Sequence, residues 1–134
     1  MVTHDRLALM LTEQHKLDSR IIKEHNVSVK MEDRMKQNIL AIMSEIGELM
    51  EGFHWKHWKR HTKPRIQYMK EELIDIQHFL NGMYLTLGMS ADEVYEMYME
   101  KNRENHGRQD GVVSGREDYK SIKTKGGWLW NLFH

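Results

Sequence analysis

Two acidic pairs are the residues of this sequence best suited to chemistry. Glu45 and Glu48 occur in GluIleGlyGlu, Glu72 and Asp75 in GluLeuIleAsp, and each pair lies inside an apolar run. Side chains three positions apart on a helix project from the same face, so each pair can act as a unit. Four carboxylates that meet in a partly dry site repel one another unless a cation neutralises them.

Magnesium is the cation that this set of side chains predicts. Mg²⁺ prefers hard oxygen ligands and shares them with phosphates, and Mn²⁺ is an alternative ion for the same ligands. We therefore predict that Glu45, Glu48, Glu72 and Asp75 are metal ligands. Glu48 is also the predicted catalytic base, because a carboxylate beside a bound cation can take a proton from water.

Apolar residues recur every three or four positions around these pairs, which predicts helices. The four expected helices run from Thr3 to about His25, from Met31 to about Lys59, from Pro64 to Gly88, and from Ser90 to about Asn105. The acidic pairs fall on the second and third of them. Strand signals are scarce. The sequence thus predicts an all-α protein, a four-helix-type bundle in which consecutive helices are antiparallel.

The periodicity ends past Gly107. Gly111 and Gly115 interrupt the chain, and the last residues are GlyGlyTrpLeuTrpAsnLeuPheHis. We predict an all-α domain over residues 1–106 and a Gly-rich C-terminal arm over residues 107–134, which packs on the domain or on a dimer partner.

Composition excludes several classes of function. The chain of 134 residues has 20 basic and 20 acidic residues, so no overall positive field favours nucleic acid as a partner. It has no cysteine and no apolar run of about eighteen residues, so we expect a cytoplasmic protein without a membrane segment. A chain this small encloses a large ligand cavity best with a second subunit, which predicts a homodimer or a higher homo-oligomer.

Two further segments accompany the acidic pairs: GluGlnHisLysLeuAsp at 13–18 and TyrMetGluLysAsnArgGluAsnHisGlyArgGln at 98–109. Together, in this order, the four parts resemble the dimeric all-α dUTPases of the MazG-like pyrophosphohydrolase superfamily. The acidic pairs are typical of the whole superfamily, whereas the 98–109 segment resembles the dUTPase branch in particular. The resemblance implies magnesium-dependent hydrolysis of a deoxynucleoside triphosphate, foremost dUTP to dUMP and pyrophosphate, by attack of water at the β-phosphorus.

The resemblance also implies substrate contacts. Lys101 and Arg108 are expected to bind phosphates and to stabilise negative charge during the reaction. Lys101 continues the face of the fourth helix that Val94 and Tyr98 are expected to turn inward, an unusual place for a charge unless a polar ligand is bound there.

The base contacts are expected from three side-chain amides and one aromatic ring. The resemblance assigns the base to Gln14 and to Asn102 or Asn105, and the family-like stretch TrpLysHisTrp at 55–58 places Trp58 near it. A side-chain amide can pair with the donor and acceptor edge of a pyrimidine. The chain is shorter than many members of this family, which suggests a viral or mobile-element protein that acts in a bacterial cytoplasm.

Other interpretations remain open. The enzyme could be a MazG-like hydrolase of dCTP or of a purine deoxynucleoside triphosphate. The chain could instead be a non-enzymatic helical adaptor, whose terminal aromatic cluster docks a partner or a membrane surface; that cluster consists of Trp128, Leu129, Trp130, Leu132 and Phe133. A di-iron bundle would use Glu51 with His54 and Asp75 with His78, but Glu51 and His54 project toward solvent.

Overall fold

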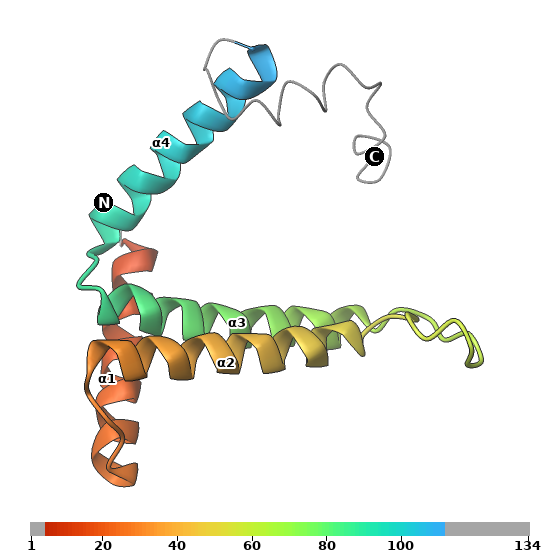
Figure 1. Cartoon of the computed structure of the whole chain (residues 1–134), viewed down its shortest axis with the longest axis horizontal. Helices are drawn as coiled ribbons and strands as arrows, with labels where there is room; N and C mark the ends of the chain where they lie inside the picture. Colours follow the sequence, from red (N-terminus) through yellow and green to blue (C-terminus); the bar gives the residue numbers. More distant parts are fainter. Residues whose placement is uncertain (1–4, 112–134) are drawn as a thin grey trace. The chain divides into compact units, whose positions relative to one another are not determined.

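The computed structural model of the chain describes residues 5–111, and every regular element in this range is an α-helix. The helices are α1 (Arg6–His25), α2 (Met31–Met50), α3 (Ile66–Thr86) and α4 (Ala91–Asp110) (Figure 1). The predicted all-α class is therefore confirmed. Most of the predicted C-terminal arm, including the terminal aromatic cluster, lies outside the described residues. No helix in the described part is long and apolar enough to cross a membrane.

Local sequence explains how α1 begins and ends. Asp5 is its N-cap, and the Asp5 carboxylate accepts a hydrogen bond from the Ala8 backbone N–H at 3.0 Å. Asn26 ends the helix in the left-handed conformation with φ 49°, which asparagine tolerates better than most residues.

Four predicted helix ends were wrong. The first helix begins at Arg6 rather than at Thr3. The second helix ends at Met50 rather than near Lys59, and the third begins at Ile66, after Pro64 instead of on it. Phe53 continues the apolar spacing of α2, so periodicity alone could not reveal that the backbone turns before it. The fourth helix continues to Asp110, beyond the predicted end near Asn105.

Helices α2 and α3 run side by side in opposite directions, and α1 packs against α3 (Figure 1). Beyond α2 the chain turns back, and the Arg65 backbone N–H donates to the Gly52 carbonyl at 2.7 Å. The Tyr68 hydroxyl donates to the Glu48 carbonyl at 2.7 Å, which fixes the register of α3 against α2. Gly52 is buried beneath the Met69 side chain, and a Cβ at this position would collide with Met69.

The interior of this chain is unusual because its buried residues are mostly polar. Among the described residues Leu11 is the single buried large hydrophobic residue, whereas four polar residues are buried: Gln14, Asn38, Glu72 and Asn81. Large apolar side chains on α2 remain open, with Leu40 66% and Met43 63% exposed. Soluble proteins rarely leave such surfaces uncovered, so the apolar faces need a further surface to pack against.

Helix α4 belongs to a second compact unit, residues 92–134, and is described here by itself. None of its residues is buried. Tyr98, on the face predicted to point inward, is 68% exposed. The inward face of α4 stays a prediction, because it concerns how this unit packs on other parts of the protein.

Candidate metal centre and nucleotide cavity

Carboxylates from α2 and α3 meet where the two helices face each other. Glu45, Glu72 and Asp75 each offer one oxygen atom, and these atoms lie within 4.8 Å of one another. Glu72 is buried, Glu45 is half-buried and Asp75 is exposed. The antiparallel packing of α2 on α3 thus brings together three of the four acidic residues singled out from sequence.

Glu48, the fourth acidic residue, lies one turn along α2 from Glu45. Its side chain is exposed, and its negative charge acts on Glu45. Glu48 is not one of the three residues whose oxygen atoms cluster. The arrangement leaves its carboxylate at the open edge of the cluster, in contact with solvent.

The electrostatics of the cluster are those of crowded acids. Burial raises the pKa of Glu45 to about 7, and hydrogen bonds to Glu72 and Glu48 and the charges of Glu48 and Asp75 act in the same direction. One oxygen of Glu45 and one of Glu72, the Oε2 atom in each, are buried without a hydrogen-bond donor. A shared proton, a water molecule or a cation can satisfy such oxygens, and a set of carboxylates without nitrogen or sulfur ligands fits a hard divalent cation.

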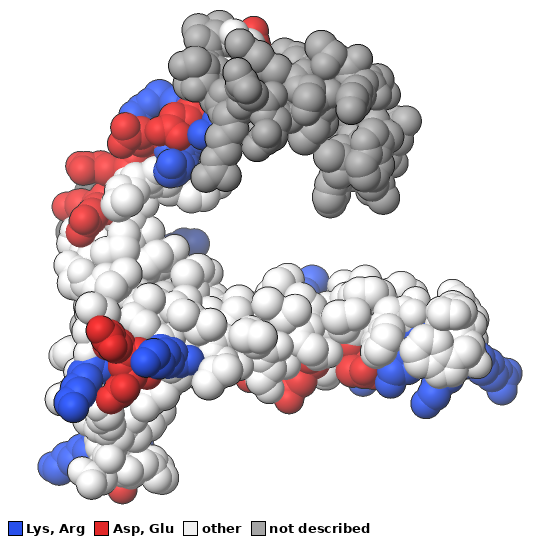
Figure 2. Space-filling view, in the orientation of Figure 1, with Lys and Arg blue, Asp and Glu red and all other residues white. Residues whose placement is uncertain are grey.

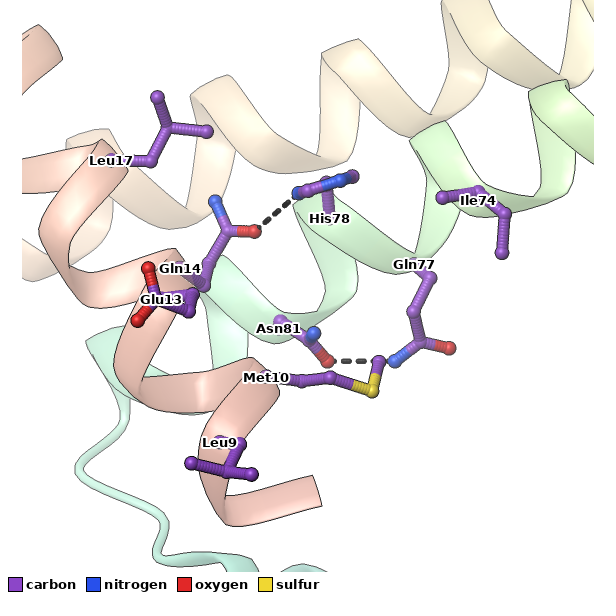
Figure 3. Close-up of a pocket in the computed structure, with 9 residues that line it drawn as sticks. All are labelled: Leu9, Met10, Glu13, Gln14, Leu17, Ile74, Gln77, His78 and Asn81. Atoms are coloured by element: carbon purple, nitrogen blue, oxygen red, sulfur yellow. Dashed lines mark hydrogen bonds between the residues drawn. The ribbon is translucent and has the colours of Figure 1, made fainter. Parts of the chain in front are cut away.

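A cavity of about 490 Å³ lies between α1 and α3 (Figure 3). On α3 the cavity is lined from Ile74 to Asn81, and His78, one of these residues, lies three positions after Asp75. The other lining residues are Leu9, Met10, Glu13, Gln14, Leu17, Ile74, Gln77 and Asn81. Its size lies within the range of about 300–1,000 Å³ that is usual for small-molecule sites.

Gln14, the base contact expected from sequence, is 6% exposed and lies at this cavity. Its Nε2 donates to Asp18 Oδ1 at 2.9 Å, and its Oε1 is 2.7 Å from His78 Nδ1 (Figure 3). Gln77 Nε2 donates to Asn81 Oδ1 at 2.6 Å, and Asn81 is 3% exposed. The cavity therefore carries side-chain amides whose partners are supplied by the protein.

Sequence reasoning gave no role to Asp18, His78 or Asn81 at this cavity. Two of the contacts could have been predicted from spacing. Gln14 and Asp18 are four positions apart, as are Gln77 and Asn81, so each pair shares a helix face. The contact of His78 with Gln14 could not be predicted in this way, since 64 positions separate the two residues.

Trp58 does not line the cavity. It lies in the segment 51–65, where it is 63% exposed and makes edge contacts with Trp55 and His57 at ring-centroid distances of 5.8 and 5.1 Å. Basic side chains gather at this end of the α2 and α3 pair (Figure 2). Lys56 Nζ lies over the Trp55 ring at 5.1 Å.

The di-iron interpretation is wrong for the described residues. Glu51 bonds the Trp55 ring N–H at 3.4 Å and pairs with Lys56 at 3.5 Å, while His54 packs against His61. Within residues 5–111 the group that could hold a metal consists of carboxylates alone.

The expected phosphate and base residues of α4 interact with one another along that helix. Lys101 pairs with Glu104 at 3.3 Å, and Arg108 lies 3.6 Å from the same carboxylate. Arg108 also donates to Asn105 Oδ1 at 3.2 Å, and Asn102 is exposed. The four residues thus occupy two adjacent turns of one helix, with Glu104 balancing the two cations.

Comparison with known proteins gives two relatives that are named for the same activity. A chain named dCTP pyrophosphatase from Enterobacteria phage T4 is 32% identical over 98 residues, which are 60% of this chain and 57% of that protein. A dCTP pyrophosphatase from Enterobacteria phage LZ5 is 38% identical over 76 residues, 48% of this chain and 44% of that one. The chain thus spans about half the length of these curated relatives. No solved structure matches it significantly.

A third relative carries a different name. A DNA replication protein of phage T4 is 30% identical over 91 residues, 55% of this chain but 23% of that protein. The family described as dUTPase matches residues 6–87, more than half of the chain, and this range contains both acidic pairs and every residue that lines the cavity. The chain therefore belongs to the dUTPase family of all-α, MazG-like proteins.

Proposed function

We propose that this protein is a magnesium-dependent pyrophosphohydrolase of deoxynucleoside triphosphates. The observation that carries the proposal is the cluster of Glu45, Glu72 and Asp75, with two buried oxygens that lack donors. Helix α3, which supplies Glu72 and Asp75, also lines a cavity of about 490 Å³. Family membership supports the same reaction class. The adaptor interpretation does not explain why three carboxylates, one of them buried, meet between two helices.

In this proposal the clustered carboxylates and Glu48 hold the cation. Magnesium, when bound, neutralises phosphate charge and makes a water molecule more acidic. Glu48 is exposed at the edge of the cluster, where its carboxylate can accept the proton of the attacking water. Lys101 and Arg108 are proposed to stabilise the negative charge of the leaving pyrophosphate.

The proposed substrate is a pyrimidine deoxynucleotide, with dUTP first and dCTP second. The family supports dUTP, and dCTP is the second candidate because both phage relatives are named for it. Gln14, Trp58, Asn102 and Asn105 are proposed base contacts. Of these, Gln14 has the strongest support, because it lines the cavity.

We further propose that the active form is a homodimer or higher homo-oligomer that acts in the cytoplasm. The exposed apolar side chains of α2 support self-association, and the phage relatives support a role in the cytoplasm of an infected bacterium.

The direct test is pyrophosphate release from dUTP, dCTP, dTTP, dATP and dGTP, each with magnesium and with EDTA. Magnesium-dependent release from one or both of dUTP and dCTP is expected. Release from purine substrates alone would keep the metal centre and discard the pyrimidine assignment, whereas no release from any substrate would contradict the proposed function.

A further inference from the structure

The Gln14 side-chain amide is held at both ends by the protein. Its nitrogen donates to Asp18 on the next turn of α1, and its oxygen meets His78 of α3. Because an ionised carboxylate only accepts hydrogen bonds, Asp18 requires the Gln14 nitrogen to face it. An amide oxygen also only accepts, so His78 Nδ1 must carry the proton that it donates to Gln14. The chemistry of the two partners thus permits one orientation of the amide.

Asp18 is itself fixed in place. Arg34 of α2 lies 3.6 Å from Asp18 Oδ2, and the two side chains are only 12% and 17% exposed, respectively. Gly82 of α3 faces the same oxygen, at a point where a Cβ would lie 3.3 Å from it. All three helices of this unit therefore contribute to the position of the Asp18 carboxylate, and through it to the Gln14 amide.

An amide held in this way leaves one N–H and one carbonyl lone pair for a ligand in the cavity. Uracil presents a donor at N3 beside an acceptor at O4, whereas cytosine presents an acceptor at N3 beside a donor at N4. An amide that can rotate by half a turn pairs with either edge. An amide that is held in one orientation pairs with the edge of one base. Against the edge of the other base it places donor beside donor and acceptor beside acceptor.

We infer that Asp18 and His78 are positioning residues that lock the orientation of the Gln14 amide and thereby determine which of the two pyrimidine bases the cavity accepts. The inference rests on the proposed function. It assigns base discrimination to two residues that lie behind the base contact and do not touch the reacting atoms.

The test compares kcat/KM for dUTP and for dCTP in matched variants. His78→Leu removes the donor, whereas His78→Asn has a similar shape and can place an N–H near the Nδ1 position. Asp18→Asn lets the Gln14 amide turn. Its control is Glu24→Gln, which removes an exposed carboxylate of α1 that pairs with Arg20. In Asp18→Asn we expect the ratio of kcat/KM for the preferred base to kcat/KM for the other base to fall by about tenfold or more, mostly through KM, because the wrong base no longer leaves buried polar groups unpaired. In His78→Leu we expect a smaller fall in the same direction, because Asp18 still holds the amide nitrogen.

In His78→Asn and Glu24→Gln the ratio is expected to stay within about threefold of the wild type, a change of less than about 0.7 kcal/mol. Unchanged ratios in His78→Leu and Asp18→Asn, with magnesium-dependent hydrolysis intact, would overturn the inference and leave the proposed function standing. A wild type that hydrolyses both nucleotides equally would overturn it as well. A wild type that releases no pyrophosphate from either would refute the proposed function, and this inference with it.

Discussion

In the metal-free protein the Glu45 carboxyl group keeps its proton up to near-neutral pH, because burial and acidic neighbours raise its pKa to about 7. The unfolded chain loses this proton near the ordinary value of 4.5. Between these two values the folded state binds the proton and the unfolded state does not. The contribution of Glu45 to stability is therefore complete below about pH 4.5 and is lost as the pH rises through about 7.

This linkage predicts the pH dependence of stability. In EDTA the free energy of unfolding should fall as the pH rises across that range, and magnesium should restore it above the upper end, because the cation replaces the proton. Denaturant unfolding of the wild type and of Glu45→Gln, with and without magnesium, measures the effect. Glu45→Gln is neutral at every pH and should lack the decline; the same decline in both proteins would contradict the assignment.

Glu72 and its neighbour Glu71 form a matched pair for testing the metal centre. Glu72 is buried with one oxygen lacking a donor, whereas Glu71 is exposed and accepts a hydrogen bond from Gln67 at 3.2 Å. Glu72→Gln should lower kcat by about a hundredfold or more, since it removes a ligand of the catalytic cation. Glu71→Gln should stay within about twofold, as surface substitutions generally do.

Stability distinguishes a lost ligand from a damaged fold. Glu72→Gln removes a buried negative charge from a crowded cluster, so in EDTA it should unfold at the same or a higher temperature than the wild type. An inactive variant that also melts well below the wild type would indicate a structural role for Glu72. Equal activity of the two variants would contradict the proposed metal centre.

At the scale of elements, the pairing of α2 with α3 depends on close contact where the chain turns between them. Gly52 lies beneath Met69, and nothing lies within 4 Å of a Cβ added at Gly47, within α2. Gly52→Ala should therefore destabilise the protein by about 1–3 kcal/mol through overpacking. Gly47→Ala should stabilise it by up to about 1 kcal/mol, because alanine is the better helix former.

Thermal or denaturant unfolding of the two variants checks this prediction. The free energy of unfolding is expected to fall in Gly52→Ala and to rise in Gly47→Ala, although the substitution is the same and the positions are five residues apart. Equal shifts, or a stable Gly52→Ala variant, would show that the two helices do not depend on the close approach at Met69. Both variants can be assayed for pyrophosphate release, since neither glycine carries a group that acts on the substrate.

Helical periodicity predicted the four elements and the faces of α2 and α3 that meet, because a spacing of three or four residues determines which side chains share a face. The position of Gln14 on the packed face of α1 followed from the same rule. The contact of Gln14 with His78 did not follow from it, because the two residues lie on different helices and are 64 positions apart. The segment 51–65 was also beyond this reasoning, since the apolar spacing runs on through Phe53 while the backbone turns.

At the scale of the whole molecule, the described residues of one copy leave many large apolar side chains exposed. Leu40 and Met43 on α2 and Ile74 on α3 are between 58% and 66% exposed. We expect sedimentation to show a homodimer or higher oligomer, and the melting temperature to rise with protein concentration.

Leu40→Lys should weaken this association, because it places a charge on an apolar contact surface. The expected result is a shift toward monomer in sedimentation, together with lower activity at equal chain concentration. A wild type that sediments as an active monomer would contradict the proposed oligomer.

The division of the chain at residue 106 also stays a prediction, although α4 is continuous across it to Asp110.

The scarcity of buried apolar side chains has a consequence for gene dosage. If paired chains are the folded form, as we propose, the concentration of working enzyme at low expression rises with the square of the amount of polypeptide made. Halving synthesis would then lower activity by more than half, since single chains would be left to degradation. The proposed oligomer would thus make the output of the gene respond steeply to its copy number, through mass action alone.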